Sequence, residues 1–163
     1  MIEIVYHPIG IIHSPFKKPK GTPIQASCAK DKQGMIEIFP EYVQGLKDIE
    51  GFSHIILIYH FHLCKDISLI VKPFLDDRPH GVFSTRAPAR PNPIGLSIVR
   101  LTSVEGKRLF VQDLDIVDGT YLLDIKPFVP AFDLRNAERI GWLAKNVERL
   151  NGMKDDGRFE KDK

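Results

Sequence analysis

Apolar and polar residues alternate over several short stretches of this chain, and this period of two is typical of β-strands. Strands are predicted at residues 2–12, 34–39, 51–63, 68–72, 82–85, 94–104, 108–116 and 121–129. The stretch 51–63 is apolar at both even and odd positions, which indicates a strand covered on both faces. Turn residues at 105–107 predict a hairpin, and those at 118–120 predict a second turn.

A helical period is clear over residues 133–150, and a single helical turn is expected at 40–46. The apolar stripe of the longer helix consists of Leu134, Ala137, Ile140, Leu143, Ala144, Val147 and Leu150. Asp133 is a suitable N-cap and Gly152 a suitable C-cap. Many short strands followed by one helix predict a mostly β fold, a small closed antiparallel β-barrel with a C-terminal helix. The expected units are the barrel at 1–132, the helix at 133–152 packed on it, and a charged flexible tail at 153–163.

Composition and charge limit the class of protein. The 163 residues suit one globular domain, and the net charge of +2 gives weak support for a nucleic-acid partner. The cations within residues 17–20 could still form one basic face with Arg78, Arg86 and Arg90. No apolar run reaches membrane length, and the first residues alternate like a strand rather than forming a signal peptide. Two cysteines without disulfide or zinc spacing favour a reducing, cytoplasmic location.

The segment 82–101, VFSTRAPARPNPIGLSIVRL, is the most informative part of the chain. Pro91 and Pro93 fix two φ angles and push Asn92 into an extended conformation. In one interpretation, Arg86 and Arg90 bind a carboxylate or phosphate and Asn92 hydrogen-bonds a ligand. In the other, all three are solvated residues of a surface turn, and the residue types alone leave both interpretations open.

Two further groups also have two interpretations. His54, His60, His62 and Cys64 share one strand parity, but no carboxylates accompany them, so half-buried histidines are expected and no metal site is predicted. The polar residues of 112–115 end a strand, where they either bind a ligand or form a turn that Asp residues favour. The chain has neither GxGxxG nor a P-loop motif, which argues against a Rossmann or P-loop nucleotide enzyme.

Four segments carry a resemblance to a known family. They are IGIIHSPFKKP (9–19), GFSHIILIYHF (51–61), TRAPARPNPIGLSIVRL (85–101) and DLDIVDGTYLLDIKPF (113–128). Read together, they closely resemble the TsaA-like (YaeB-type, TrmO) family of S-adenosylmethionine-dependent tRNA methyltransferases, over residues 4–130. The resemblance implies a small barrel that binds S-adenosylmethionine without a Rossmann sheet, a homodimer, and tRNA as the partner. The implied reaction is N6-methylation of threonylcarbamoyl-adenosine at tRNA position 37.

The family's cofactor positions imply a set of binding residues in this chain. They are Pro23, Ile24, Gln25, His62, Leu63, Arg86, Leu96, Gln112, Asp113, Leu114 and Asp115. The family often has Pro-Arg-Gln at the first of these sites and His-Gln at the second, so Ile24 and Leu63 imply backbone or apolar contacts. Longer bacterial members carry an additional C-terminal domain, whereas this chain continues only through residues 133–163.

For such a reaction we hypothesise a mechanism centred on Asn92, by chemical analogy with Asn-Pro motifs in other amino-methylating enzymes, with Arg86 and Arg90 as the other candidate catalytic residues. The lone pair of an adenine N6 is delocalised into the ring, so acceptors for its hydrogen would help to direct it towards the methyl group. The Asn92 amide oxygen and the carbonyl of Pro91 or Pro93 could be those acceptors, whereas the structural alternative is that Asn92 caps the loop. Two other functions stay open: a module that binds S-adenosylmethionine or RNA without methyl transfer, and a methyltransferase with another substrate.

Overall fold

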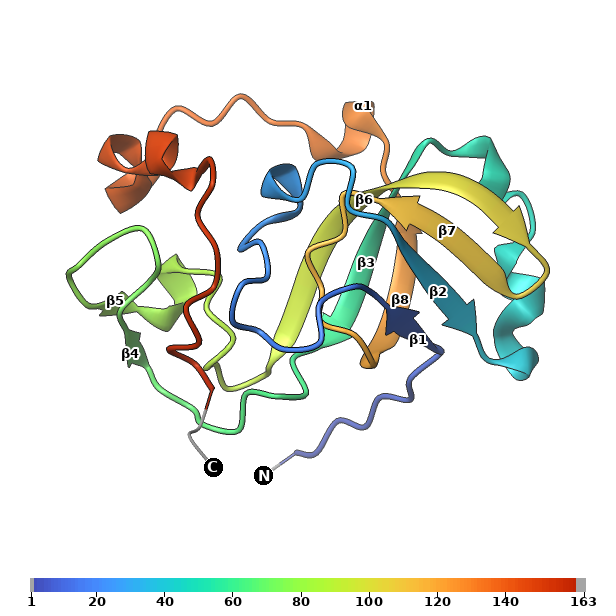
Figure 1. Ribbon diagram of the computed structural model, residues 1–163, viewed down its shortest axis with the longest axis horizontal. Helices are drawn as coiled ribbons and strands as arrows, with labels where there is room; N and C mark the ends of the chain where they lie inside the picture. The colour runs from blue at the N-terminus through green and yellow to red at the C-terminus, as the bar shows by residue number, and fades with distance from the viewer. Residues whose placement is uncertain (1, 161–163) are drawn as a thin grey trace.

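The computed structural model describes residues 2–160, and its main feature is a closed six-stranded barrel (Figure 1). Around the barrel the strands follow the order β1–β2–β7–β6–β3–β8, and every neighbouring pair is antiparallel. The strands are β1 (Gly10–His13), β2 (Gly34–Ile38), β3 (His54–His60), β6 (Ile94–Glu105), β7 (Arg108–Gln112) and β8 (Thr120–Pro127). The predicted mostly β fold and closed antiparallel barrel are confirmed.

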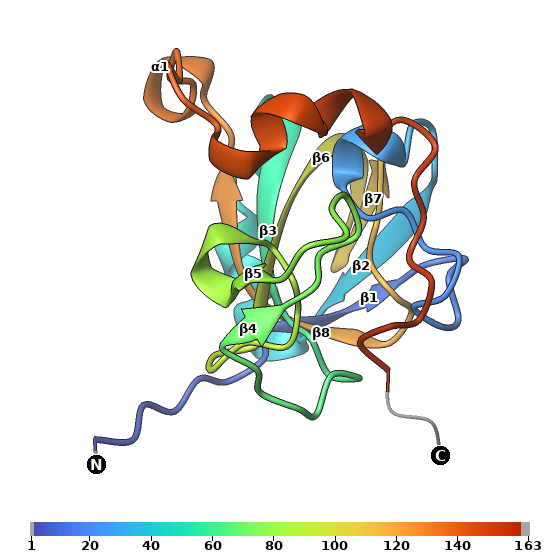
Figure 2. The ribbon, with the colours of Figure 1, turned by 90° about the vertical axis from the view of Figure 1, so that its left-hand side faces the viewer.

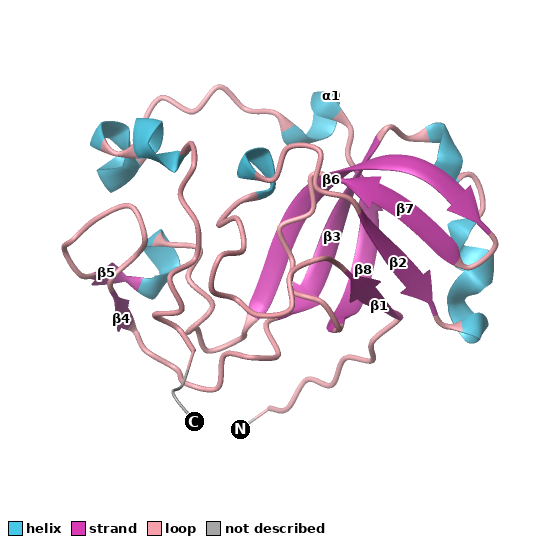
Figure 3. Cartoon of the chain, viewed as in Figure 1, coloured by secondary structure: helices cyan, strands magenta, loops and turns pink. Residues whose placement is uncertain are grey.

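A smaller lobe lies beside the barrel and contains the two-stranded sheet of β4 (Ile70–Val71) and β5 (His80–Gly81). Figure 3 shows that loops make up most of this side of the molecule, with short helices between them. The 3₁₀ helices are Ala26–Cys28, Pro40–Leu46, Ile49–Gly51, Val82–Ser84, Gly141–Lys145 and Val147–Leu150. Within residues 2–160, no helix is long and apolar enough to cross a membrane.

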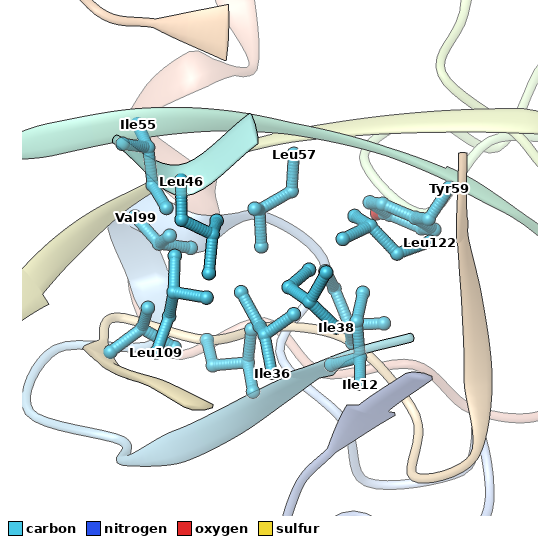
Figure 4. Packing of buried hydrophobic residues seen from close by; sticks show 13 residues of the cluster. Ile12, Ile36, Ile38, Leu46, Ile55, Leu57, Tyr59, Val99, Leu109 and Leu122 are labelled. Atoms are coloured by element: carbon cyan, nitrogen blue, oxygen red, sulfur yellow. The ribbon is translucent and has the colours of Figure 1, made fainter. Parts of the chain in front are cut away.

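Alternation along the strands fills the barrel with apolar side chains (Figure 4). In β3 the residues Ile55, Leu57 and Tyr59 point inward and are buried, whereas the residues between them lie on the outer face and are half-buried. The expectation that 51–63 is buried on both faces is therefore only half right. The reason is that a closed barrel has one interior, so each of its strands buries one face there.

Two predicted strands differ from the structure. The first strand begins at Gly10 rather than at residue 2, and residues 2–7 are exposed and form no strand. The second difference is Val82–Ser84, which forms a turn of 3₁₀ helix rather than a strand. Both segments have β-branched or aromatic residues, but neither has a neighbouring strand to complete its backbone hydrogen bonds.

The continuous helix predicted over residues 133–150 is not formed, and this expectation is corrected. Instead, α1 (Pro130–Asp133) is one short turn, and the two 3₁₀ helices Gly141–Lys145 and Val147–Leu150 follow after an extended connection. Gly141 has a φ of 59°, which no α-helix contains, and residues 131–141 are exposed. Because most helical stability comes from a packed apolar face, a stripe whose first half, Leu134 to Ile140, is exposed does not hold a continuous helix.

The charged C-terminal segment makes regular contacts that its composition did not predict. Residues 154–160, the C-terminal strap, lie along residues 21–23, with Lys154 bridged to Pro23. The Gly21 amide donates to the Asp155 carbonyl at 2.7 Å, and the Asp155 amide donates to the Thr22 carbonyl at 2.8 Å. The strap thus contradicts a freely extended tail over this part, while residues 161–163 lie outside the described residues. The division into barrel, helix and tail as separate units stays a prediction.

Candidate functional site

A cavity of about 410 Å³ opens at the end of the barrel where β3 ends and β6 and β8 begin. Its wall combines this barrel end with three loops, residues 19–25, 61–64 and 85–92, and with the C-terminal strap. We call it the rim cavity. Its size lies within the range of about 300–1,000 Å³ that is usual for small-molecule sites.

Most of the residues predicted to bind a cofactor come together in the rim cavity. The lining residues from that set are Pro23, Ile24, Gln25, His62, Leu63, Arg86, Leu96 and Asp115. The other two candidate catalytic residues, Arg90 and Asn92, also line it. These positions are far apart in the sequence, so the fold gathers them at one end of the barrel.

Three predicted residues do not line the rim cavity. Gln112 is the last residue of β7 and pairs with Arg100, and Leu114 is fully buried in the barrel core. The Asp113 carboxylate accepts a hydrogen bond from the Asp31 amide at 3.0 Å. The cause is local: Asp113 has a φ of 65°, and this turn of the backbone leaves only Asp115 of the four facing the cavity.

A buried chain of polar side chains runs from the barrel interior to the rim cavity. The Tyr59 hydroxyl lies 3.1 Å from the Ser97 hydroxyl, and Ser97 donates to the Asp115 carboxylate at 2.6 Å. Gly95 makes this arrangement possible, because a Cβ atom there would overlap the Tyr59 ring with which it pairs. The glycine of the sequence motif is thus explained by close packing against the Tyr59 ring.

Burial has the largest effect on the pKa values of Asp115 and Tyr59 in this row of polar side chains. It raises the pKa of Asp115 to about 6, although the Ser97 hydrogen bond and the nearby Arg86 charge both act in the opposite direction. Burial also raises the pKa of Tyr59, and the Asp115 charge adds to this effect. A carboxylate that is costly to ionise in the free protein gains most from a cationic ligand, because the ligand's charge offsets the desolvation.

The two arginines of the loop 85–92, Arg86 and Arg90, lie in different environments. The Arg90 guanidinium donates to the carbonyls of Thr85 and Ala87, at 3.2 and 3.1 Å, and thereby holds the loop together. Arg86 is exposed, and its guanidinium donates to the Gln25 side-chain oxygen at 2.8 Å. Arg86 therefore points at the cavity wall with most of its donors available, whereas Arg90 acts within the loop.

Asn92 lies exposed at the cavity mouth in a loop with fixed backbone hydrogen bonds. The Ile94 amide donates to the Asn92 carbonyl at 2.7 Å, and the Phe61 amide donates to the Pro93 carbonyl at 2.8 Å. Within residues 2–160 the Asn92 side chain has no hydrogen-bond partner. Backbone hydrogen bonds thus hold this end of the loop, and the Asn92 amide group is not used as a cap.

The histidine group of β3 divides between two places. His54 and His60 lie on the outer face of β3, whereas His62 and Cys64 line the rim cavity. His62 Nδ1 lies 3.3 Å from the Thr120 hydroxyl, and burial, with a contribution from His60, lowers the pKa of His62. Within the described part of the chain, no group of three or more metal-ligating side chains gathers at one point.

Sequence reasoning missed several lining residues. Tyr59 and Ser97 were detectable in principle, because both are polar residues at inward positions of otherwise apolar strands. Asp155, Phe159 and Glu160 of the C-terminal strap also line the cavity, and their charged surroundings in the sequence resemble a disordered tail. Only the pairing of the strap with residues 21–23 brings these three to the site.

The closed antiparallel barrel with a cavity at its rim places this protein in the class of β-barrel domains with a small-molecule-sized cavity. The family model described as tRNA-methyltransferase O N-terminal domain matches residues 11–134. The chain belongs to this family. It is 64% identical over 158 residues to a probable S-adenosyl-L-methionine-binding protein of Pyrococcus abyssi, covering 97% of this chain and 86% of that protein.

Two further relatives carry more specific names. A mouse tRNA (adenine(37)-N6)-methyltransferase is 36% identical over 138 residues, which is 80% of this chain but 32% of the mouse protein. The crystal structure of TrmO from Pseudomonas aeruginosa superposes with a TM-score of 0.73 at 36% identity, covering 86% of this chain and 63% of that one. The chain thus spans about a third of the mouse protein and under two thirds of the bacterial one.

Proposed function

We propose that this protein is an S-adenosylmethionine-dependent methyltransferase that methylates N6 of the adenine at tRNA position 37. The observation that carries the proposal is the rim cavity, where eight of the residues implied for cofactor binding meet the Arg86 and Asn92 loop. The names of the relatives from Pyrococcus abyssi and mouse support the cofactor and the acceptor, respectively. We further propose the threonylcarbamoyl form of that adenine as the acceptor, as the family resemblance implies.

The chemistry of the rim cavity fits S-adenosylmethionine. Asp115 provides a buried carboxylate for the cationic part of the molecule, and Arg86 has free donors for its carboxylate. Leu63 and Leu96 provide apolar contact area for the adenine ring, in keeping with the loss of a polar residue at position 63. A cavity that combines an acidic and a basic side chain with apolar lining residues suits a zwitterion that carries an apolar ring.

S-adenosylmethionine supplies a methyl group that is already reactive, so the protein's own task is positioning. The backbone carbonyl of Pro93 already accepts from the Phe61 amide, which leaves the Asn92 side chain and the Pro91 carbonyl as acceptors for an incoming amine. We assign to the Asn92 side-chain oxygen the role of accepting a hydrogen bond from the N–H of the amine to be methylated. This hydrogen bond directs the nitrogen lone pair towards the methyl group. Arg90 becomes a positioning residue that fixes the loop.

The test compares tRNA nucleosides from cells with and without the gene, together with transfer of labelled methyl from the cofactor to purified tRNA. The expected result is one methylated adenosine derivative that is lost in the deletion strain and restored by the wild-type gene. Binding of the cofactor with no transfer to any tRNA would instead favour a non-enzymatic binding module. Transfer to a different nucleoside or small amine would refute the acceptor.

We also propose that the protein works as a homodimer in the cytoplasm. The outer face of β6 exposes Ile94, Leu96 and Ile98 in a row, with exposed fractions of 40%, 52% and 38%, and this face continues into the rim cavity, which Ile94 and Leu96 also line. A second copy is the simplest cover for such a face, because two-fold pairing is the commonest closed symmetry. The two free cysteines and a tRNA substrate support the cytoplasm. Light scattering should give twice the 18.5 kDa chain mass, and a mass near 18.5 kDa at micromolar concentration would contradict the dimer.

A further inference from the structure

A second cavity, of about 520 Å³, lies next to the rim cavity and is not explained by cofactor binding. We call it the tryptophan cavity. The two cavities share a wall made by Ile24, Gln25, Phe74, Thr85, Arg86 and Phe159. Of the implied cofactor residues, Ile24, Gln25 and Arg86 belong to this shared wall, whereas Asp115 and Leu96 face the rim cavity alone. The cofactor residues thus assign the rim cavity to the cofactor and leave its neighbour for another ligand.

The residues that complete the tryptophan cavity come from outside the family-matched segment 11–134. Trp142, Leu143, Val147 and Leu150 belong to the two 3₁₀ helices that follow the barrel. Figure 2 shows these helices crossing above the β4–β5 lobe and reaching towards the 3₁₀ helix Ala26–Cys28. The Cys28 thiol donates to the Leu150 carbonyl at 3.3 Å, which fixes the far end of the segment.

Trp142 is held rigidly in the cavity wall. Its ring stacks on the His80 ring at a centroid distance of 4.5 Å and an angle of 24°, and its indole N–H donates to the Ser84 carbonyl at 2.8 Å. His80 in turn lies 3.0 Å from the Asp76 carboxylate. A ring fixed by a stack and a hydrogen bond loses little side-chain entropy on binding, so it is a prepared surface for a planar ligand.

Aromatic and basic side chains surround this surface. Phe83, two residues after β5, also lines the cavity and is 77% exposed although it is apolar. Arg86 is the basic residue of the cavity wall, and the exposed Lys145 ends the 3₁₀ helix that carries Trp142, while the exposed Arg149 lies on the next one. Stacking aromatic rings combined with neighbouring cations are the combination that binds unstacked bases of RNA loops and their phosphates.

We propose that the tryptophan cavity binds the base of the acceptor nucleoside, with Trp142 and Phe83 as its stacking surfaces. This inference rests on the proposed tRNA methyltransferase function. Because the two cavities adjoin at Arg86, a base in the tryptophan cavity places its amino group on the side nearest the rim cavity, whose lining includes Asn92. The segment 141–150, which lies outside the family-matched residues 11–134, then performs part of the substrate recognition.

Trp142 is the single tryptophan of the sequence, so its fluorescence reports on this cavity directly. We would titrate the full-length protein, saturated with S-adenosylhomocysteine, with tRNA from cells that lack the gene, using free tryptophan amide as the absorbance control. Saturable quenching of Trp142 by tRNA, and by adenosine at higher concentration, is the expected result. Saturable tRNA binding in a filter assay without quenching would overturn the inference. Equal quenching by S-adenosylmethionine alone would overturn it too, because the cofactor would then occupy this cavity.

Variants separate stacking from folding. Trp142→Ala and Phe83→Ala should each raise KM for tRNA about fivefold to 150-fold, the range expected for one lost base stack, while Kd for the cofactor stays within twofold. Trp142→Phe should restore most of the affinity. Phe132→Ala is the matched control, because Phe132 is 71% exposed and lines neither cavity. If Trp142→Ala fails to fold, the exposed Phe83 decides the question, and an unchanged KM for Phe83→Ala would refute the inference.

These outcomes distinguish the inference from the proposed function. Methyl transfer to tRNA with unchanged KM in the Phe83 and Trp142 variants would leave the function standing and remove the tryptophan cavity from it. Absence of methyl transfer together with quenching of Trp142 by tRNA would refute the function and retain a base-binding cavity.

Discussion

Asp115 offers the sharpest test of the rim cavity, because its protonation should control cofactor affinity near neutral pH. Burial raises its pKa to about 6, so the carboxyl is about nine-tenths ionised at pH 7 and about one-tenth ionised at pH 5. If only the ionised form binds the cationic cofactor, the affinity falls about tenfold between these pH values. Calorimetric titration with S-adenosylmethionine at pH 5, 6, 7 and 8 measures this change.

The variant Asp115→Asn isolates this group from its neighbours. His62, Asp155 and Glu160 also line the rim cavity, and Arg86 and Tyr59 act on Asp115 itself. Asparagine keeps an oxygen that accepts from the Ser97 hydroxyl, but it does not titrate. We therefore expect weaker binding at pH 7 and a nearly flat profile from pH 5 to 7. The same tenfold slope in the variant, or a flat profile in the wild-type protein, would refute the role of Asp115.

The stability of the free protein should respond to Asp115 in the opposite direction. Its folded pKa lies above the ordinary value of 3.8, so the fold binds this proton more tightly than the unfolded chain does. The resulting stabilisation is complete below about pH 4 and is lost as the pH rises through about 6. Asp115→Asn should therefore raise the melting temperature of the free protein at pH 7, by a free energy of at most about 3 kcal/mol. A lower melting temperature at pH 7 would show that the charge is already compensated.

Three further substitutions test other parts of the site. Gly95→Ala should destabilise the fold by about 1–3 kcal/mol and lower the melting temperature by several degrees, because the added Cβ overlaps the tyrosine ring packed there. The control Gly45→Ala, at an open position, should leave the melting temperature unchanged. Arg86→Ala should reduce activity about tenfold to a hundredfold, whereas Lys107→Ala, in a hairpin turn paired with β2, should have little effect; equal losses would show that the site is misplaced. Asn92→Ala should lower kcat in single-turnover assays while cofactor Kd and melting temperature stay unchanged, and a rate within threefold of wild type would end its catalytic assignment.

The sequence was sufficient to predict the barrel, because its cause is local and repeated. Short segments rich in β-branched and other apolar residues, such as β3 and β6, indicate strands, and short turns between strands favour antiparallel pairs. The motif of residues 85–101 also indicated a stiff polar loop that enters a strand, and in the structure this loop lines the rim cavity. Both inferences depend on patterns within a few residues.

The part of the site that comes from the residues after the barrel could not be predicted from the sequence. Residues 133–150 have the period of a helix, but the first half of that stripe, Leu134 to Ile140, lies exposed. Short 3₁₀ turns replace the helix and present Trp142 to a cavity. The charged strap 154–160 looks disordered until Gly21 and Thr22 supply a partner for its backbone. In both cases the decisive contacts join residues more than fifty positions apart.

The sequence by itself determined the class of fold, the loop that carries Arg86 and Asn92, and the carboxylate at position 115. Only the tertiary structure decided which of the four residues 112–115 lines the rim cavity, because one backbone angle at Asp113 turns its neighbours into the core or towards other partners. Only the tertiary structure could also raise the pKa of that carboxyl, since burial depends on the residues that surround it and not on those beside it in the chain.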